Sequence, residues 1–422
     1  MNAIRIESAY AIARDIYAEH GVDTDEAARK LAAVPLSLHC WQGDDVGGFE
    51  SPGAAPGGGL AVTGNHPGKA RTIEELRLDL RRAFTLIPGP HRLNLHAMYG
   101  EFGAAAPDRN ALEPDHFRGW VDWAKEEKLK LDFNATCFAH PQAASGFTLS
   151  HRDKAVRQFW IDHVKCCRKI SAVLGREQKN TCLHNLWIPD GAKEAPVNRI
   201  GRRELLRDAL DEIFETEYSP SQMKDSLESK LFGIGSEAFV VGSHEFYLGY
   251  AVAKGKLVCL DLGHFHPTES VADKISALLL FLPGLVFHLS RGLRWDSDHV
   301  VVLNDEIQAV TEEIVLSRAL DRCHIALDYF DAGLNRVGAW VVGARAALKG
   351  LLQAFLLPAK KIAQAELNGD GFARLALREE ARALPFGAVW DYYCLTSGVP
   401  PGAEFVAEVA RYESEVQSRR GG

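Results

Sequence analysis

The sequence lacks the cysteine pattern of a zinc knot or a redox motif. Its 422 residues contain eight cysteines but no Cys-x-x-Cys pair, and most of these cysteines lie within apolar runs. Cysteines of this kind are typical of buried free thiols in a reducing compartment. We therefore expect a cytoplasmic protein without disulfides.

An excess of basic residues and a membrane-length apolar run are missing as well. The 48 basic and 56 acidic side chains give a formal charge of −8, which argues against a nucleic-acid partner. The most apolar segment, residues 275–290, is interrupted by Pro283 and Gly284 and is too short to cross a bilayer as one helix. The N-terminus has the pattern of an amphipathic helix, and Glu7, Arg14 and Asp15 interrupt any apolar core in it, so we expect neither a signal peptide nor a membrane partner.

No Gly-x-Gly-x-x-Gly or Walker loop follows any apolar run, which disfavours a doubly wound nucleotide-binding sheet. Instead, short apolar runs alternate with helical patterns, as expected for parallel strands that are buried on both faces. The eight runs are residues 34–41, 92–99, 130–138, 181–188, 226–233, 256–264, 284–291 and 322–330. This alternation predicts an α/β fold, a (β/α)8 TIM barrel.

Helical segments flank the predicted barrel. We expect a helical lead-in over residues 1–33, the barrel over 34–346, and a helical extension over 347–422 that forms oligomer contacts. Between the first two strands, Thr72 and Glu75 have the spacing of a helix capping box.

One connection is unusually long and rich in glycine. Residues 43–71 contain nine glycines and three prolines. A loop of this length in a compact domain is usually a functional lid or a disordered segment. Because this loop joins two strands of one barrel, we favour a lid over the site.

Polar side chains gather at the predicted C-terminal ends of the strands, where TIM barrels build their active sites. In chain order they are His39, His96, Asp190, Glu228, Lys230, Asp261, His264, His266, His288, Asp296, Asp298, Asp328 and Asp331. Each alone has a structural explanation, such as an ion pair between Glu228 and Lys230 or helix capping by Asp328 and Asp331.

The heptapeptide RWDSDHV places Asp296, Asp298 and His299 within four positions. Together with the other strand-end acids, these carboxylates would repel one another in a barrel mouth unless a cation neutralised them. Carboxylate and imidazole ligands without thiolate favour Mn²⁺, Mg²⁺ or Co²⁺, with Zn²⁺ possible, and the number of acids is sufficient for two ions.

Aromatic residues accompany these polar residues at the strand ends. They are Trp41, Phe133, Phe138, Trp187 and Phe265. They could belong to the core or could stack against the apolar face of a sugar. A polyhydroxylated substrate chelated by a divalent ion fits both sets of residues.

Seven strings together resemble bacterial L-rhamnose isomerase over about residues 8–418. They are LHCWQGDDVGGFE, AVTGNHPGKAR, FTLSH, RQFWIDH, ESKLFGIG, LDLGHFHPTE and RWDSDHV. The resemblance implies a cytoplasmic homotetramer with a (β/α)8 fold that converts L-rhamnose to L-rhamnulose with divalent metal. The Ala- and Gly-rich string SPGAAPGGG departs from the family pattern within the lid.

The resemblance also implies roles for individual residues. It places a catalytic Mn²⁺ at His264, Asp296 and Asp298, and a second, more structural ion, Mn²⁺ or Zn²⁺, at Glu228, Asp261, His288 and Asp331. Lys230, His96 and Asp331 would be catalytic, with His96 assisting ring opening and Lys230 polarising a substrate oxygen or a bridging water. Trp41, His96, Phe138, Trp187, Glu228 and Lys230 would contact the sugar, while His299 and His266 would be buried supporting residues.

The expected mechanism is ring opening followed by a metal-assisted shift of hydride from C2 to C1. Its rival is an ene-diol route with a general base. Two other functional classes stay open at this point. One is a barrel metal enzyme that acts on another aldose or on a phosphodiester, and the other is a non-catalytic sugar-binding protein.

Overall fold

Eight parallel strands close into a barrel in the computed structural model, which describes residues 2–43, 46–50, 64–103, 106–231, 236–293 and 298–420. The order around the barrel is β1-β10-β9-β8-β6-β4-β3-β2. These strands are β1 (Leu36–His39), β2 (His91–His96), β3 (Lys130–Asn134), β4 (Cys182–Trp187), β6 (Met223–Glu228), β8 (Leu257–Asp261), β9 (Leu285–Leu289) and β10 (Cys323–Leu327). The predicted (β/α)8 fold is confirmed.

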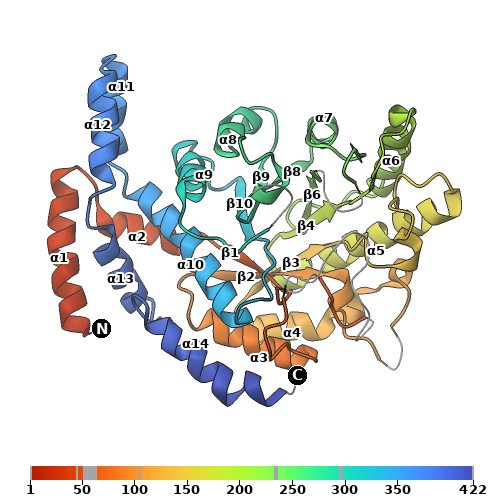
Figure 1. The fold of residues 1–422 in the computed structure, drawn as a ribbon, viewed down its shortest axis with the longest axis horizontal. Coiled ribbons are helices and arrows are strands. Elements are labelled where there is room, and N and C mark those ends of the chain that lie inside the picture. Colours follow the sequence, from red (N-terminus) through yellow and green to blue (C-terminus); the bar gives the residue numbers. More distant parts are fainter. Residues whose placement is uncertain are drawn as a thin grey trace.

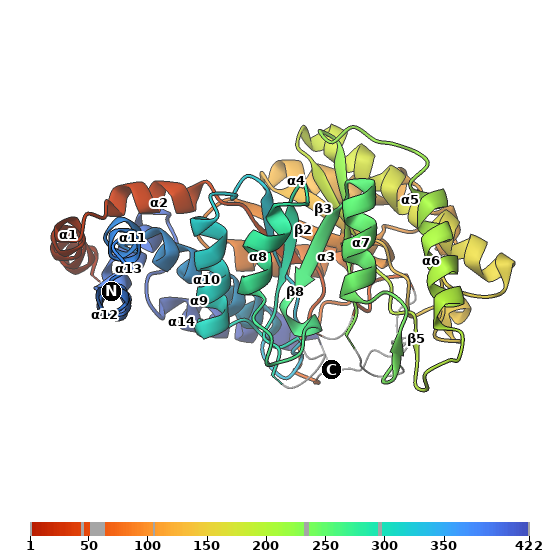
Figure 2. The same ribbon diagram turned by 90° about the horizontal axis from the view of Figure 1, so that it is seen from above.

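Helices surround the barrel and extend to one side of it (Figures 1 and 2). They are α1 (Ala3–Glu19), α2 (Thr24–Ala32), α3 (Ile73–Phe84), α4 (Arg118–Glu126), α5 (Lys154–Gln178), α6 (Arg199–Ile213), α7 (His244–Lys254), α8 (Ala272–Leu279), α9 (Asp305–Leu316), α10 (Arg336–Phe355), α11 (Ala359–Leu367), α12 (Gly371–Ala381), α13 (Phe386–Thr396) and α14 (Glu404–Glu415). A short antiparallel pair, β5 (Gly191–Ala192) and β7 (Phe239–Val240), lies outside the barrel.

The fifth barrel strand begins three residues earlier than the apolar pattern predicts. β6 covers Met223–Glu228, whereas the predicted run began at residue 226. Glu228 is therefore the last residue of the strand, and Lys230 lies just beyond it. This position places Glu228 at the rim, level with Cys259 of β8 in the sheet register.

The first and last segments of the chain pack against each other. Tyr10 of α1 stacks on Tyr392 of α13 with ring centroids 3.8 Å apart, and Lys361 Nζ donates to the carbonyl of Glu19. Figures 1 and 2 show α1 beside α11–α13 at the end of the molecule opposite α5 and α6. The predicted boundary at 347 falls inside α10, which runs continuously from the barrel into this helical end.

No single helix of the described chain is both long and apolar enough to span a membrane, although α10 and α11, bent by 54° at their break, pass the same test together. The buried face of α10 includes Trp340, Leu348 and Leu351, which pack in the main core.

The described ends of the glycine-rich connection are anchored on the barrel. The backbone N–H of Phe49 donates to the carbonyl of Met98, and that of His66 donates to the carbonyl of Ala332. His66 also contacts Glu413 of α14 at 2.8 Å. Residues 44–45 and 51–63, which make up most of the predicted lid, lie outside the described residues.

The predicted capping box at α3 is only half formed. The Thr72 hydroxyl accepts from the backbone N–H of Glu75, as the motif requires. The Glu75 carboxylate instead binds the backbone N–H and the guanidinium of Arg71. The helix starts at the predicted residue, but the Glu75 carboxylate binds the backbone N–H of Arg71 where a capping box would have it bind that of Thr72.

Candidate metal and sugar site

Four acidic and imidazole side chains converge from strands β6, β8, β9 and the end of β10. They are Glu228, Asp261, His288 and Asp328, and their ligand atoms all lie within 4.8 Å of one another. His288 Nδ1 is 3.0 Å from Asp328 Oδ2, 3.4 Å from Glu228 Oε1 and 3.8 Å from Asp261 Oδ2. All four sit at carboxyl ends of strands, so the barrel itself brings them together.

A second group shares Asp261 with the first. Asp261, His264 and Asp298 also place their ligand atoms within 4.8 Å of one another. His264 Nε2 lies 3.9 Å from Asp298 Oδ2, and its Nδ1 lies 3.3 Å from Glu228 Oε1. Asp296, the remaining predicted ligand of this group, lies outside the described residues.

Gly263 explains why the turn after β8 reads Leu-Gly-His. A Cβ added at this glycine would overlap Oδ1 of Asp298. The backbone N–H of Gly263 also donates to Asp261 Oδ1 over 2.7 Å. The glycine therefore lets Asp298 approach while it orients Asp261, a role that the sequence reasoning missed.

The pKa values of these side chains reflect burial and the close approach of several carboxyl groups. Burial and the neighbouring carboxylates hold the pKa of Asp261 well above its usual value, although His264 acts in the opposite direction. Burial also raises the pKa of Asp328. Burial alone would raise the pKa of Glu228 too, but His288 and His264 bring it below its ordinary value. The pKa of His288 is raised despite its burial, because the carboxylates of Glu228 and Asp328 favour its charged form.

Several buried atoms in the first group have no hydrogen-bond partner among the described residues. They are Asp261 Oδ2, Asp328 Oδ1 and both ring nitrogens of His288, of which Nδ1 faces the carboxylates. Buried polar atoms are normally satisfied, so the atoms that face one another here point to a missing ligand. Carboxylate oxygens and imidazole nitrogens are donors for divalent cations such as Mn²⁺ and Zn²⁺. The residues present therefore fit a bound divalent ion.

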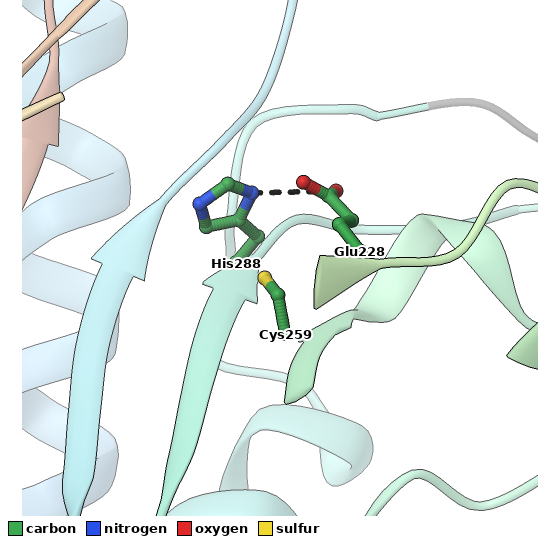
Figure 3. A group of neighbouring side chains, drawn as sticks. All are labelled: Glu228, Cys259 and His288. Atoms are coloured by element: carbon green, nitrogen blue, oxygen red, sulfur yellow. Dashed lines mark ion pairs between the residues drawn. The ribbon is translucent and has the colours of Figure 1, made fainter. Parts of the chain in front are cut away.

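Cys259 lies next to this group and was not predicted as part of it. Figure 3 shows its sulfur below the imidazole of His288, which faces Glu228, and the three residues form a further set of possible metal donors. Burial raises the pKa of the Cys259 thiol, so it is protonated in the metal-free protein. The carboxylates and imidazoles are thus the readier ligands.

The structure brings Asp328, and not Asp331, to the metal donors. Asp331 was predicted as a ligand and a catalytic residue, but it belongs to neither group, and its Oδ1 accepts from the backbone N–H of Gly333. Asp328 follows the last residue of β10 directly, while Asp331 lies three residues further on. The distance from the strand end is the signal that separates the two aspartates.

Three other histidines named in the sequence predictions differ from expectation or have structural partners. His266 is exposed and contacts the Thr268 hydroxyl at 2.7 Å, so the predicted buried supporting role is wrong. His39 Nδ1 lies 3.2 Å from the carbonyl of Leu327, and its Nε2 accepts from Trp340. His299 is half-buried, and its backbone forms a bridge with Arg291.

Asn185 was not predicted and supports the first group from β4. Its side-chain N–H donates to Glu228 Oε2, and its Oδ1 accepts from the Ser226 hydroxyl. The carboxylate of Asp190, by contrast, accepts from the backbone N–H groups and the hydroxyls of Thr148 and Ser150. Asp190 is therefore a structural residue of the loops around the barrel.

An aromatic wall stands beside the metal donors. Its rings form a continuous row in which each contacts the next. The ring centroids are 5.3 Å apart for Trp41 and His96, 5.7 Å for His96 and Phe138, 5.5 Å for Phe138 and Trp187, and 6.1 Å for Trp187 and His264. Lys230 Nζ lies 5.2 Å from the centroid of the Trp187 ring. The predicted sugar contacts are thus neighbours, and Phe330, which stacks on Trp41, extends the wall.

The other two candidate aromatics, Phe133 and Phe265, make their ring contacts outside this wall. Phe133 packs edge-on against Phe117 in the core, and Phe265 packs against His244. His96 is buried within the wall, and burial lowers its pKa to about 3. The imidazole is therefore neutral near pH 7.

Comparison with known proteins gives consistent matches over the whole chain. The family model described as L-rhamnose isomerase (RhaA) matches residues 4–420. The L-rhamnose isomerase of Rhodopirellula baltica is 55% identical over 415 residues, which cover 98% of this chain and 97% of the relative. Those of Enterobacter sp. and Bacteroides thetaiotaomicron are 53% and 52% identical and cover 99% and 98% of this chain, and 99% of each relative.

Proposed function

Because the chain belongs to the L-rhamnose isomerase family, we propose that it interconverts L-rhamnose and L-rhamnulose as an aldose–ketose isomerase. The observation that carries this proposal is identity above half of all positions with enzymes of that name, along nearly the full length of both chains. The convergence of metal donors and an aromatic wall in one barrel mouth supports it. A non-catalytic sugar-binding protein would need neither group of donors.

We propose that Mn²⁺ binds Asp261, His264 and Asp298, together with Asp296. A second divalent ion, Mn²⁺ or Zn²⁺, would bind Glu228, Asp261, His288 and Asp328, the last replacing Asp331 in the predicted set. When bound, a divalent ion supplies Lewis-acid polarisation of the carbonyl and adjacent hydroxyl oxygens of an aldose.

The surrounding side chains would bind and orient the sugar. Lys230, held over Trp187, offers N–H donors to a substrate oxygen. His96, neutral and at the end of β2, assists ring opening. The wall of Trp41, Phe138 and Trp187 covers the apolar face of the sugar and keeps bulk water away from C1 and C2.

Exclusion of water favours a direct shift of hydride from C2 to C1 over an ene-diol route. Conversion of L-rhamnose in deuterated water tests this step. We expect no solvent deuterium at C1 of the product, whereas stoichiometric incorporation there would support proton transfer through a general base.

The proposed activity is tested by ketose formation from L-rhamnose before and after exhaustive chelation. We expect activity to disappear with EDTA and to return with added Mn²⁺. Asp298→Asn should lose turnover while it keeps the wild-type circular dichroism spectrum. Turnover that survived complete removal of divalent metal would contradict the metal-dependent mechanism.

We further propose a cytoplasmic homotetramer. The eight cysteines are free, which supports a reducing compartment. Helix α12 has no buried residue, and Leu367, Phe372 and Leu375 expose 82%, 82% and 68% of their surface on the α11–α12 hairpin. A second copy that covered this hairpin would remove these apolar side chains from water. Light scattering of Phe372→Glu should show smaller assemblies than the wild type, while an unchanged mass would contradict this contact.

A further inference from the structure

A buried polar network lies behind the aromatic wall and ends on His96. The imidazole Nδ1 of His96 is 3.0 Å from the hydroxyl of Thr136, which follows β3 and is fully buried. The rings of Trp41 and Phe138 both pack against the imidazole of His96, at interplanar angles of 68° and 67°. Nδ1 of His96 is therefore occupied by a hydrogen bond inside the protein.

Thr136 is itself fixed by its backbone. Its N–H donates to Nε2 of His163 over 3.0 Å, and its carbonyl accepts from Arg109 over 2.8 Å. Because Nε2 of His163 accepts, the proton of that imidazole must sit on Nδ1, which donates to the carbonyl of Arg109. His163 is fully buried and Arg109 is 2% exposed, so water does not compete for these hydrogen bonds.

The same arginine ties Thr136 to the sugar side of the site. Its guanidinium also donates to the carbonyls of Phe138 and Ala139 and pairs with Glu50 at the edge of the glycine-rich connection. The backbone from Thr136 to Ala139 is thus held from one side by a single buried side chain. This leaves the Thr136 hydroxyl little freedom to move away from His96.

The hydrogen-bonding requirement of that hydroxyl sets the tautomer of His96. A buried O–H must donate to an acceptor, and His96 Nδ1 is the acceptor that the described residues offer it. Nδ1 then carries no proton, and the neutral ring bears its hydrogen on Nε2. Nε2 makes no hydrogen bond to the described chain and is not among its buried unsatisfied atoms, so it is open to a ligand.

We propose that Thr136 is a positioning residue that fixes His96 as a hydrogen-bond donor, through Nε2–H, to the ring oxygen of the cyclic sugar. The inference deepens the proposed isomerase function and rests on it. In this arrangement His96 polarises the C1–O5 bond before ring opening and does not act as a base toward C2. Arg109 and His163 act one step further away, through the backbone of Thr136.

The test compares two substitutions that differ by the hydroxyl. Thr136→Val keeps the shape and removes the donor, while Thr136→Ser keeps the donor and serves as the matched control. We expect kcat/KM for L-rhamnose to fall about tenfold in Thr136→Val and to stay within about threefold of wild type in Thr136→Ser. Thermal unfolding and metal content of each variant establish that the fold and the donors at the barrel mouth are intact.

A double-mutant cycle with His96→Ala then separates positioning from a general structural effect. If Thr136 acts through His96, Thr136→Val should cost little further activity in the His96→Ala background. Equal losses in the valine and serine variants, or a full additional loss in the double variant, would overturn the proposal. An inactive wild-type chain would instead overturn the isomerase function itself, so the two failures are distinguishable.

Discussion

The two ends of the barrel treat buried charge in opposite ways. Nearer the N-terminal ends of the strands, at the base, the buried acids Asp132 and Asp225 each meet an arginine. Arg92 makes two bonds to Asp132, at 2.6 and 2.8 Å, and Arg168 makes two to Asp225, at 3.0 and 3.1 Å. At the mouth, Glu228, Asp261, Asp298 and Asp328 gather around two histidines.

The pKa values follow this difference. At the base, burial opposes ionisation, but Arg92 still holds the pKa of Asp132 below its usual value. For Asp225, His184 and Arg168 likewise overcome burial and lower the pKa. At the mouth, the pKa of Asp261 is raised. The base is thus complete as an ion-paired structure, while the mouth needs a positive ion from outside the chain.

The largest effect should come from neutralising the acid that both mouth groups share. Asp261→Asn keeps the Oδ1 acceptor for Gly263 and Ser290 but removes a charge from each group. We expect kcat to fall about 10³-fold or more, because metal binding weakens and less transition-state charge is stabilised. The metal-free variant should be at least as stable as the metal-free wild type.

Steady-state kinetics, metal analysis and urea unfolding check this prediction together. Asp122→Asn, on the exposed face of α4, is the matched control and should change none of them. A metal-free Asp261→Asn protein less stable than the wild type would show that this carboxylate stabilises the mouth without an ion.

The corresponding change at the base should have the reverse outcome. Asp225→Asn leaves Arg168 and Lys256 without their buried counter-charge. Removing one partner of such a pair should lower the free energy of unfolding by about 3–5 kcal/mol. The kcat of the folded fraction should stay within about threefold of wild type. A loss of turnover comparable to that of Asp261→Asn would break the division between base and mouth.

The sequence was informative where one strong pattern determined position. Eight apolar runs predicted eight barrel strands, because strands that are buried on both faces have a nearly continuous apolar sequence. Because TIM barrels build their sites at the carboxyl ends of strands, the sequence alone also predicted that Glu228, Asp261, His264 and His288 lie close together. The aromatic neighbours Trp41, Phe138 and Trp187 followed from the same rule.

Positions that depend on a few residues of loop geometry were harder to predict. Asp328 and Asp331 both follow the last strand, and only the point at which β10 ends distinguishes them. Asn185, Gly263 and Thr136 escaped because amides, glycines and hydroxyls are common in every loop. Their roles depend on distances to groups far away in the sequence, such as Glu228 and His96.

The pH dependence of stability should separate the two ends further. A carboxyl with a lowered folded pKa stabilises the fold above its unfolded pKa of about 3.9 and loses this contribution as pH falls through the folded value. The stability difference between wild type and Asp225→Asn should therefore be full at pH 7 and shrink below about pH 4.

For Asp261 the sign is opposite, because its folded pKa is raised. The metal-free Asp261→Asn variant should exceed the wild type in stability at pH 7, and this advantage should vanish as the wild-type carboxyl is protonated at lower pH. Urea unfolding from pH 3 to 7 measures both differences. Parallel curves for the two variants would contradict the contrast.

The smallest expected effects come from the aromatic ring beside a lysine at each end. Lys230 Nζ lies 5.2 Å from the Trp187 ring at the mouth, and Lys256 Nζ lies 4.2 Å from the Phe214 ring at the base. Each contact should be worth about 1 kcal/mol. Trp187→Phe should lower kcat/KM about fivefold with little change in unfolding temperature, because its ring belongs to the wall proposed to contact the sugar. Phe214→Leu should lower the free energy of unfolding by a similar amount and leave kcat/KM unchanged. If Phe214→Leu instead lowered kcat/KM and Trp187→Phe lowered only stability, the assignment of catalysis to the mouth would be contradicted.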